Sequence, residues 1–196
     1  MTIRRIVAKL LTLICLVAAS GCGRSPAVNF YTLAAIAPEA ASPVTKPHAI
    51  AVGPVTLPEL VDRPQLVIRF DANRVGIIET HRWAEPLKSE ITRILAENLA
   101  RLLRPSRISA YDQSASLDAE YSVLVDIQRF ESVQGEGVTI DALWAVRRSA
   151  VDGVPIKGRS LVHEPANGPG YRELVAAHGR ALAAISGDIA KALQNQ

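Results

Sequence analysis

The fold is decided by one stretch of the chain, YSVLVDIQRFESVQGEGVTIDALWAV, which occupies residues 121–146. Apolar side chains recur at every second position on both sides of Gly135-Glu136-Gly137, a pattern typical of two half-buried strands joined by a hairpin turn. Asp152-Gly153 signals another tight turn, into a third strand near 154–162. The sequence therefore predicts an antiparallel meander. Its expected buried side chains are Tyr121, Val123, Val125, Ile127, Val138, Ile140, Ala142, Trp144 and Val146.

Shorter segments before the meander also have the period of a strand. Ile50 and Val52 alternate with alanines, and residues 66–70 alternate in the same way. Residues 75–79 show a weaker version of the pattern. We expect these segments to extend the sheet.

Two further segments have the helical period instead. Pro86 and Pro105 bracket the first segment, and the second runs from about Tyr171 to Leu193. The sequence thus predicts a two-layer α+β fold, a largely antiparallel sheet with two amphipathic helices packed on one face. The two apolar stripes consist of Leu87, Ile91, Ile94, Leu95, Leu99, Leu102 and Leu103, and of Leu174, Val175, His178, Leu182, Ile185, Ile189 and Leu193.

The first 21 residues are laid out as an export signal. A basic start precedes an apolar stretch from Leu10 to Ala19, and Ser20-Gly21 forms a small-residue exit. Ten apolar residues are too few to span a hydrocarbon core of about 30 Å. We expect residues 1–21 to be a cleaved lipoprotein signal peptide.

Cys22 is the expected lipidation site. Ala19-Ser20-Gly21-Cys22 resembles a lipobox, although Leu is commoner than Ala at its first position, and cleavage by an ordinary signal peptidase is the alternative. Cys15 leaves with the signal, so the mature chain has one cysteine, and a thioether-linked lipid removes its oxidation liability. Gly23, in place of Asp, favours the outer membrane in enteric-type sorting.

Residues 22–48 are predicted to form a lipidated flexible tether, and residues 49–196 a single periplasmic α+β domain. The tether is rich in Ala, Pro and Ser and reaches about 80 Å when extended. Phe30 to Leu33 is the exception, because these residues are suited to an edge strand docked on the domain.

Composition argues against nucleic acid as a partner. Removal of the signal, which carries three basic and no acidic residues, leaves 19 basic and 19 acidic side chains. The few aromatic residues stand at strand positions that we expect to be buried. A neutral, exported chain lacks the basic surface that nucleic-acid binding requires.

No motif in the chain predicts an enzyme, a metal site or a cofactor other than the covalent lipid. HExxH, CxxC, Walker and GxSxG patterns are all missing from the sequence. His178 lies on an apolar helix stripe, where a structural histidine is commoner than a catalytic base. Glu85, Glu90 and Glu97 have basic neighbours at helical spacing, so we interpret them as a solvated, salt-bridged face.

Two motifs carry a family resemblance, GPVTLPELVDRPQ at residues 53–65 and RWAEPL at residues 82–87. With the lipobox and Tyr31-Thr32-Leu33, they resemble the ABC-type transport auxiliary lipoproteins, the PqiC-like family of Gram-negative bacteria. The resemblance covers nearly all of the mature chain. It implies a non-enzymatic docking subunit at the periplasmic face of the outer membrane, serving a lipid-transport system that maintains membrane integrity. The implied partners are an MCE-domain protein and inner-membrane transport components; homo-oligomerisation stays open.

The first motif supplies the candidate docking residues Glu59, Asp62 and Arg63, held in a proline-stiffened loop. The alternative is that Asp62 and Arg63 pair only to hold the loop. Trp83 is either an interface anchor or, as we favour, a side chain that covers the core. The competing functions are a periplasmic lipid carrier and an envelope hydrolase.

Overall fold

The computed structural model describes residues 3–4, 26–36, 46–149 and 153–194. The predicted lipidation site at Cys22 and most of the signal peptide lie outside these residues. No helix of the described ranges is long and apolar enough to cross a membrane. The strands are β1 (Asn29–Tyr31), β2 (Ala49–Thr56), β3 (Gln65–Arg69), β4 (Val75–Trp83), β5 (Arg107–Ala110), β6 (Tyr121–Val133), β7 (Gly137–Arg148) and β8 (Ile156–Pro165). The helices are α2 (Leu87–Leu102), α3 (Tyr171–Gln194) and a short 3₁₀ helix, η1 (Ser114–Ser116).

The predicted meander is confirmed as β6, β7 and β8, which form the two longest antiparallel ladders of the sheet. The β6–β7 turn lies at Gly135-Glu136-Gly137, where Gly135 has a φ of 81° that favours glycine. Asp152 lies outside the described residues, so the second turn stays a prediction. On its other edge β6 pairs in parallel with β2 and, at Val133, with β3, and the sheet continues through β4 to β1.

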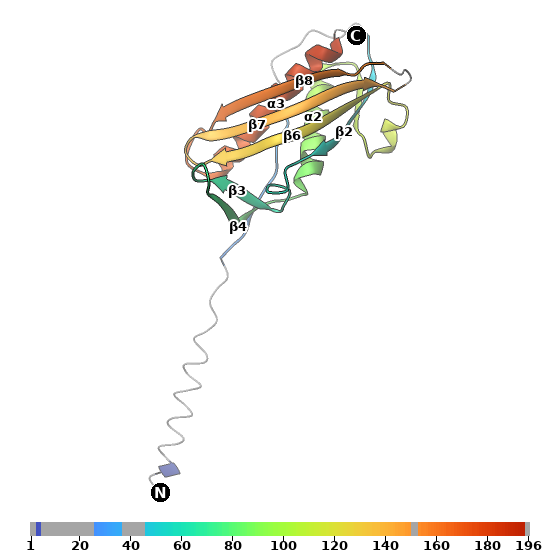
Figure 1. Cartoon of the computed structure of the whole chain (residues 1–196). Helices are drawn as coiled ribbons and strands as arrows, with labels where there is room; N and C mark the ends of the chain where they lie inside the picture. Colours follow the sequence, from blue (N-terminus) through green and yellow to red (C-terminus); the bar gives the residue numbers. More distant parts are fainter. Residues whose placement is uncertain (1–2, 5–25, 37–45, 150–152, 195–196) are drawn as a thin grey trace.

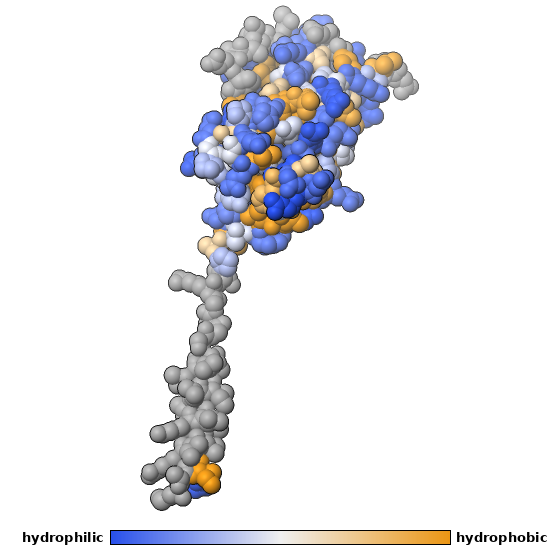
Figure 2. Space-filling view, turned by 60° about the vertical axis from the view of Figure 1, so that its left-hand side comes forward, coloured by the Kyte–Doolittle hydropathy of each residue, from blue (hydrophilic) through white to orange (hydrophobic). Residues whose placement is uncertain are grey.

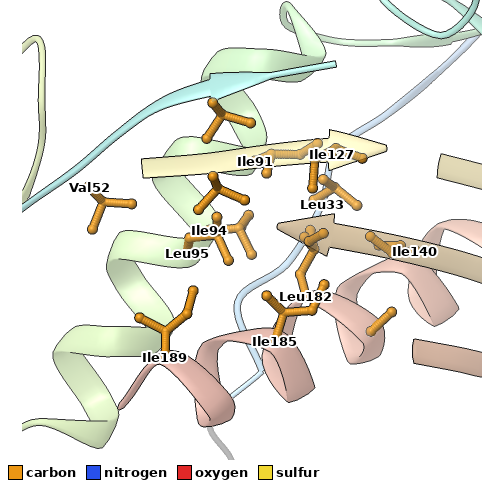
Figure 3. Close-up of a cluster of buried hydrophobic side chains, with 14 of the residues drawn as sticks. Leu33, Val52, Ile91, Ile94, Leu95, Ile127, Ile140, Leu182, Ile185 and Ile189 are labelled. Atoms are coloured by element: carbon orange, nitrogen blue, oxygen red, sulfur yellow. The ribbon is translucent and has the colours of Figure 1, made fainter. Parts of the chain in front are cut away.

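Both helices pack on one face of this mostly antiparallel sheet, as the sequence predicts (Figure 1). Every side chain of the two predicted stripes is buried. Figure 3 shows how helix residues such as Leu95, Ile185 and Ile189 meet Val52 and Ile140 from the strands. The core is therefore the interface between the two layers.

One strand, β5, has no signal in the sequence. It is four residues long and pairs in parallel with β2 from Ala49↔Arg107 to Val52↔Ala110. Ile108 is its only large apolar side chain. A strand this short is held by its ladder with β2 rather than by an apolar pattern of its own.

Residues 29–36 form an N-terminal strap that binds to the domain. Its first part, β1, pairs in parallel with β4, and Leu33 is 2% exposed in the core. The edge strand suggested for this segment is thus present. This part of the predicted tether belongs to the folded domain, because the β1–β4 ladder and the burial of Leu33 both hold it there.

Glu90 of α2 fixes the strap, which corrects our interpretation of this residue as solvated. Its Oε1 accepts a hydrogen bond from the Leu33 amide at 2.7 Å and another from the Thr32 hydroxyl, and the residue is fully buried. Further along, the Arg101 guanidinium donates to the Ala35 carbonyl at 2.7 Å. The strap covers a helix face that, in the sequence of α2 alone, looks like solvent-exposed surface.

Candidate docking surface

The loop between β2 and β3 is compact and held by its own backbone. The amides of Val61 and Asp62 both donate to the Pro58 carbonyl, at 3.0 and 3.2 Å. Val61 is buried, whereas Glu59 and Leu60 are exposed. The loop is therefore fixed to the core through Val61 and presents the neighbouring side chains to solvent.

Asp62 forms an ion pair with Lys88 and not with Arg63, the partner that the sequence suggests. Its Oδ2 lies 2.6 Å from Nζ of Lys88, in the first turn of α2. Arg63 is half-buried instead, and its Nε is enclosed without a hydrogen-bond partner among the described residues. Glu59 and Asp62 are thus the accessible candidates of the loop, and Arg63 is a less accessible one.

Trp83 is a core residue. Its side chain is 6% exposed and its ring makes edge contacts with Phe130 and with His178. The Trp83 amide also donates to the Pro64 carbonyl at 2.7 Å, which ties the loop to the end of β4. Its candidate role as an interface anchor is wrong for this conformation, because an anchor must be accessible to the partner.

A groove of about 370 Å³ adjoins the loop. One wall is the start of α2 and the other is the segment that follows β5. Lys88 belongs both to the groove and to the ion pair with Asp62, so the loop and the groove form one continuous surface. We call this surface the docking surface. The groove residues are Val55, Glu85, Lys88, Ser89, Thr92, Arg93, Ala110, Tyr111, Asp112 and Gln113.

The first sequence motif shapes this groove. Gly53 has a φ of +117°, and a Cβ at this position would overlap the Tyr111 ring, so glycine lets Tyr111 pack against β2. Val55 of the same motif lines the groove, and Glu85 of the second motif lies beside it. Sequence reasoning missed the groove because its far wall follows β5, which has no pattern of its own.

The groove carries charges of both signs on side chains that are partly or fully exposed. Glu85, Lys88 and Arg93 line the α2 side of the groove, and Asp112 lines the side that follows β5. Within the described ranges, no three His, Cys, Asp or Glu side chains are grouped as metal ligands. Such a surface suits polar contacts with another protein better than it suits an apolar ligand.

Ser132 and His178 form a pair that resembles a nucleophile and its base. The Ser132 hydroxyl lies 2.8 Å from Nε2 of His178, whose ring stacks on Phe130 at 3.9 Å. Both residues are buried, and Nδ1 of His178 has no partner in the described part of the chain to orient the ring. Burial lowers the pKa of His178 to about 3, which makes it a poor base. The pair is therefore part of the packing.

His178 should make the domain less stable in acid. Its pKa is about 3 in the folded protein and near 6.5 in the unfolded chain, so the unfolded state binds more protons between these values. The contribution of neutral His178 to the free energy of unfolding is fully present above pH 6.5 and is lost as the pH drops toward 3. At pH 5 the loss is about 2 kcal/mol. Urea unfolding at pH 7 and pH 5 measures this loss. In His178→Gln the loss should shrink by that amount, and an unchanged loss would contradict the assignment.

The comparisons with known proteins agree with this architecture. The family model of the ABC-type transport auxiliary lipoprotein component matches residues 31–190. A crystal structure of an uncharacterized protein has a TM-score of 0.69 and 20% identity, covering 86% of this chain and 99% of the other. Protein XCC0632 from Xanthomonas campestris, of family model DUF330, has the same TM-score and 14% identity, covering 83% and 93%.

At these identities the solved structures show a shared fold, and no curated protein matches the chain. The family match is more specific, since it runs from β1 into the last turns of α3 and includes the loop and the groove. The chain therefore belongs to the family of ABC-type transport auxiliary lipoprotein components.

Proposed function

We propose that this auxiliary component is anchored through a lipid on Cys22 to the periplasmic face of the outer membrane. There it docks onto an MCE-domain protein of a lipid-transport system and acts without catalysing a reaction. The observation that carries the proposal is the family match over residues 31–190. The docking surface supports it, because a rigid loop and a polar groove lie together on one accessible side of the domain.

The alternative of a lipid carrier receives little support from the packing. An acyl chain between sheet and helices needs an apolar channel, but among the described residues these layers meet in one continuous cluster of buried apolar side chains. The pocket at the β3 end of the interface, between Val61 and Phe130, measures about 10 Å³, room for one water molecule. Native mass spectrometry of refolded protein mixed with phospholipid should show no bound lipid; a stable one-to-one complex would favour the carrier.

Reversing the charge of Asp62 should weaken docking while the fold survives. The Asp62–Lys88 ion pair is exposed, so Asp62→Arg is expected to lower the free energy of unfolding by less than about 1 kcal/mol. At the interface, a reversed charge that faces a like charge of the partner costs more binding free energy than the variant loses in stability. The affinity for the MCE-domain protein should therefore fall about tenfold or more. Calorimetric titration gives the affinity, and urea unfolding gives the stability.

Three control variants separate docking from a structural role. The double variant Asp62→Arg/Lys88→Glu restores an ion pair with reversed polarity, so stability should return while binding stays weak. Lys88→Glu should weaken binding, whereas Lys191→Glu, which disrupts the exposed pair with Asp188 on α3, should not. Recovery of binding in the double variant would show that the pair only holds the loop.

A further inference from the structure

The strap leaves only a short chain between the anchor and the folded domain. Pairing of β1 with β4 fixes the chain from Asn29 onward, and the Leu33–Glu90 hydrogen bond fixes it again further along. Residues 23–28 alone separate Cys22 from β1. Seven residue steps span at most roughly 25 Å, well short of the 80 Å expected for a free tether of residues 22–48.

The direction of β1 decides which end of the domain lies near the anchor. Because β1 runs parallel to β4, with Asn29 opposite His81 and Tyr31 opposite Trp83, the chain before Asn29 approaches from the side where β4 begins. Val75, the first residue of β4, follows the turn of the β3–β4 hairpin. Figure 1 shows the segment of residues 26–36 entering the domain beside β4.

Large apolar side chains are exposed at this end. Phe30 is 66% exposed, Ile77 42% and Val28 41%. The exposure of Phe30 corrects the expectation that the aromatic residues of strands are buried. Ile77 pairs with Val67 on the sheet face opposite to buried Leu66. Hydrophobic surface is visible at this end of the domain in Figure 2. We call Val28, Phe30 and Ile77 the anchor-proximal surface.

The charges around this surface compensate one another. Arg69 pairs with Glu131 at 2.8 Å, Arg74 with Asp71 at 3.2 Å and Arg82 with Glu79 at 3.1 Å. An array of paired charges has little net attraction for anionic headgroups, whereas exposed Phe and Ile side chains gain by entering the bilayer interface. The recognition expected here is apolar.

We propose that the anchor-proximal surface rests on the bilayer that holds the lipids of Cys22. The inference rests on the lipidation of Cys22 in the proposed function. The short chain is the reason to choose lipid as the partner of this surface, because it keeps the surface within about 25 Å of the bilayer that holds the anchor. Three side chains bind a membrane weakly from solution. The tether supplies the high local concentration that makes the contact persist.

Tryptophan quenching by brominated lipid tests this contact. Mature protein is coupled through Cys22 to a maleimide lipid in vesicles of phosphatidylethanolamine and phosphatidylglycerol doped with brominated phosphatidylcholine. Phe30→Trp and Ile77→Trp each add one reporter to native Trp83 and Trp144, and circular dichroism confirms the fold. Leu161→Trp is the matched control, because Leu161 is 62% exposed on the edge strand β8, at the other side of the sheet.

The reporters at positions 30 and 77 should be quenched at least about twofold more than the reporter at position 161. Replacing phosphatidylglycerol with phosphatidylcholine, or raising the salt concentration, should leave the difference unchanged. Equal quenching at all three positions, or stronger quenching at position 161, would overturn the proposal, and so would a requirement for phosphatidylglycerol. Coupling supplies the lipid chemically, so these results do not depend on whether cells lipidate Cys22.

Discussion

In a Leu99→Asp variant the domain is expected to be unfolded or degraded at neutral pH. Leu99 has no exposed surface and lies in the last turn of α2, with the core residue Leu95 one turn before it and Leu102 and Leu103 just after it. A carboxylate there must either stay charged without a partner or take up a proton, and either costs several kcal/mol. Typical domains are stable by only 5–15 kcal/mol in total. Circular dichroism and thermal unfolding measure the effect.

Ser89→Asp is the matched control for this variant. It adds the same charge to α2, but at an exposed position in the first turn, where a negative charge favours the helix dipole. Its melting temperature should equal or exceed that of the wild type. Normal stability of Leu99→Asp would mean that the core face of α2 is misassigned.

In a Cys22→Ser variant the protein should leave the membrane fraction or stay unprocessed. Serine has no thiolate to receive a diacylglyceryl group, and several acyl chains, at about 0.8 kcal/mol for each buried methylene, provide the lasting anchor. The weak anchor-proximal contact alone should not retain the protein. Fractionation of envelopes and labelling with palmitate measure the change, and a palmitate-labelled variant in the outer membrane would exclude Cys22 as the anchor.

The parts of the fold with a regular local pattern were predictable from the sequence. The meander of residues 121–165 and the two helix stripes repeat their apolar residues often enough that the period determines the face. His178 was placed in the core for the same reason. In each case the burial of a residue follows from its own neighbours along the chain.

The strap and the groove depend instead on contacts between distant segments. Glu90 looks like a surface residue until residues 32 and 33, far away in the sequence, cover it. Asp62 finds its partner on α2 rather than in its own loop, so the local pattern Asp62-Arg63 suggested the wrong pair. The far wall of the groove follows β5, which only its ladder with β2 defines. No periodicity encodes such contacts.

Capture of the lipidated protein from crosslinked envelopes tests the docking function most directly. Cells that carry the wild-type chain are compared with cells that carry Asp62→Arg, and captured proteins are identified by mass spectrometry. We expect an MCE-domain protein to be crosslinked to the wild type and largely lost from the variant, while both forms of the lipoprotein remain in the outer membrane. An MCE-domain protein that is present in the envelope but is not crosslinked to the wild type would contradict it.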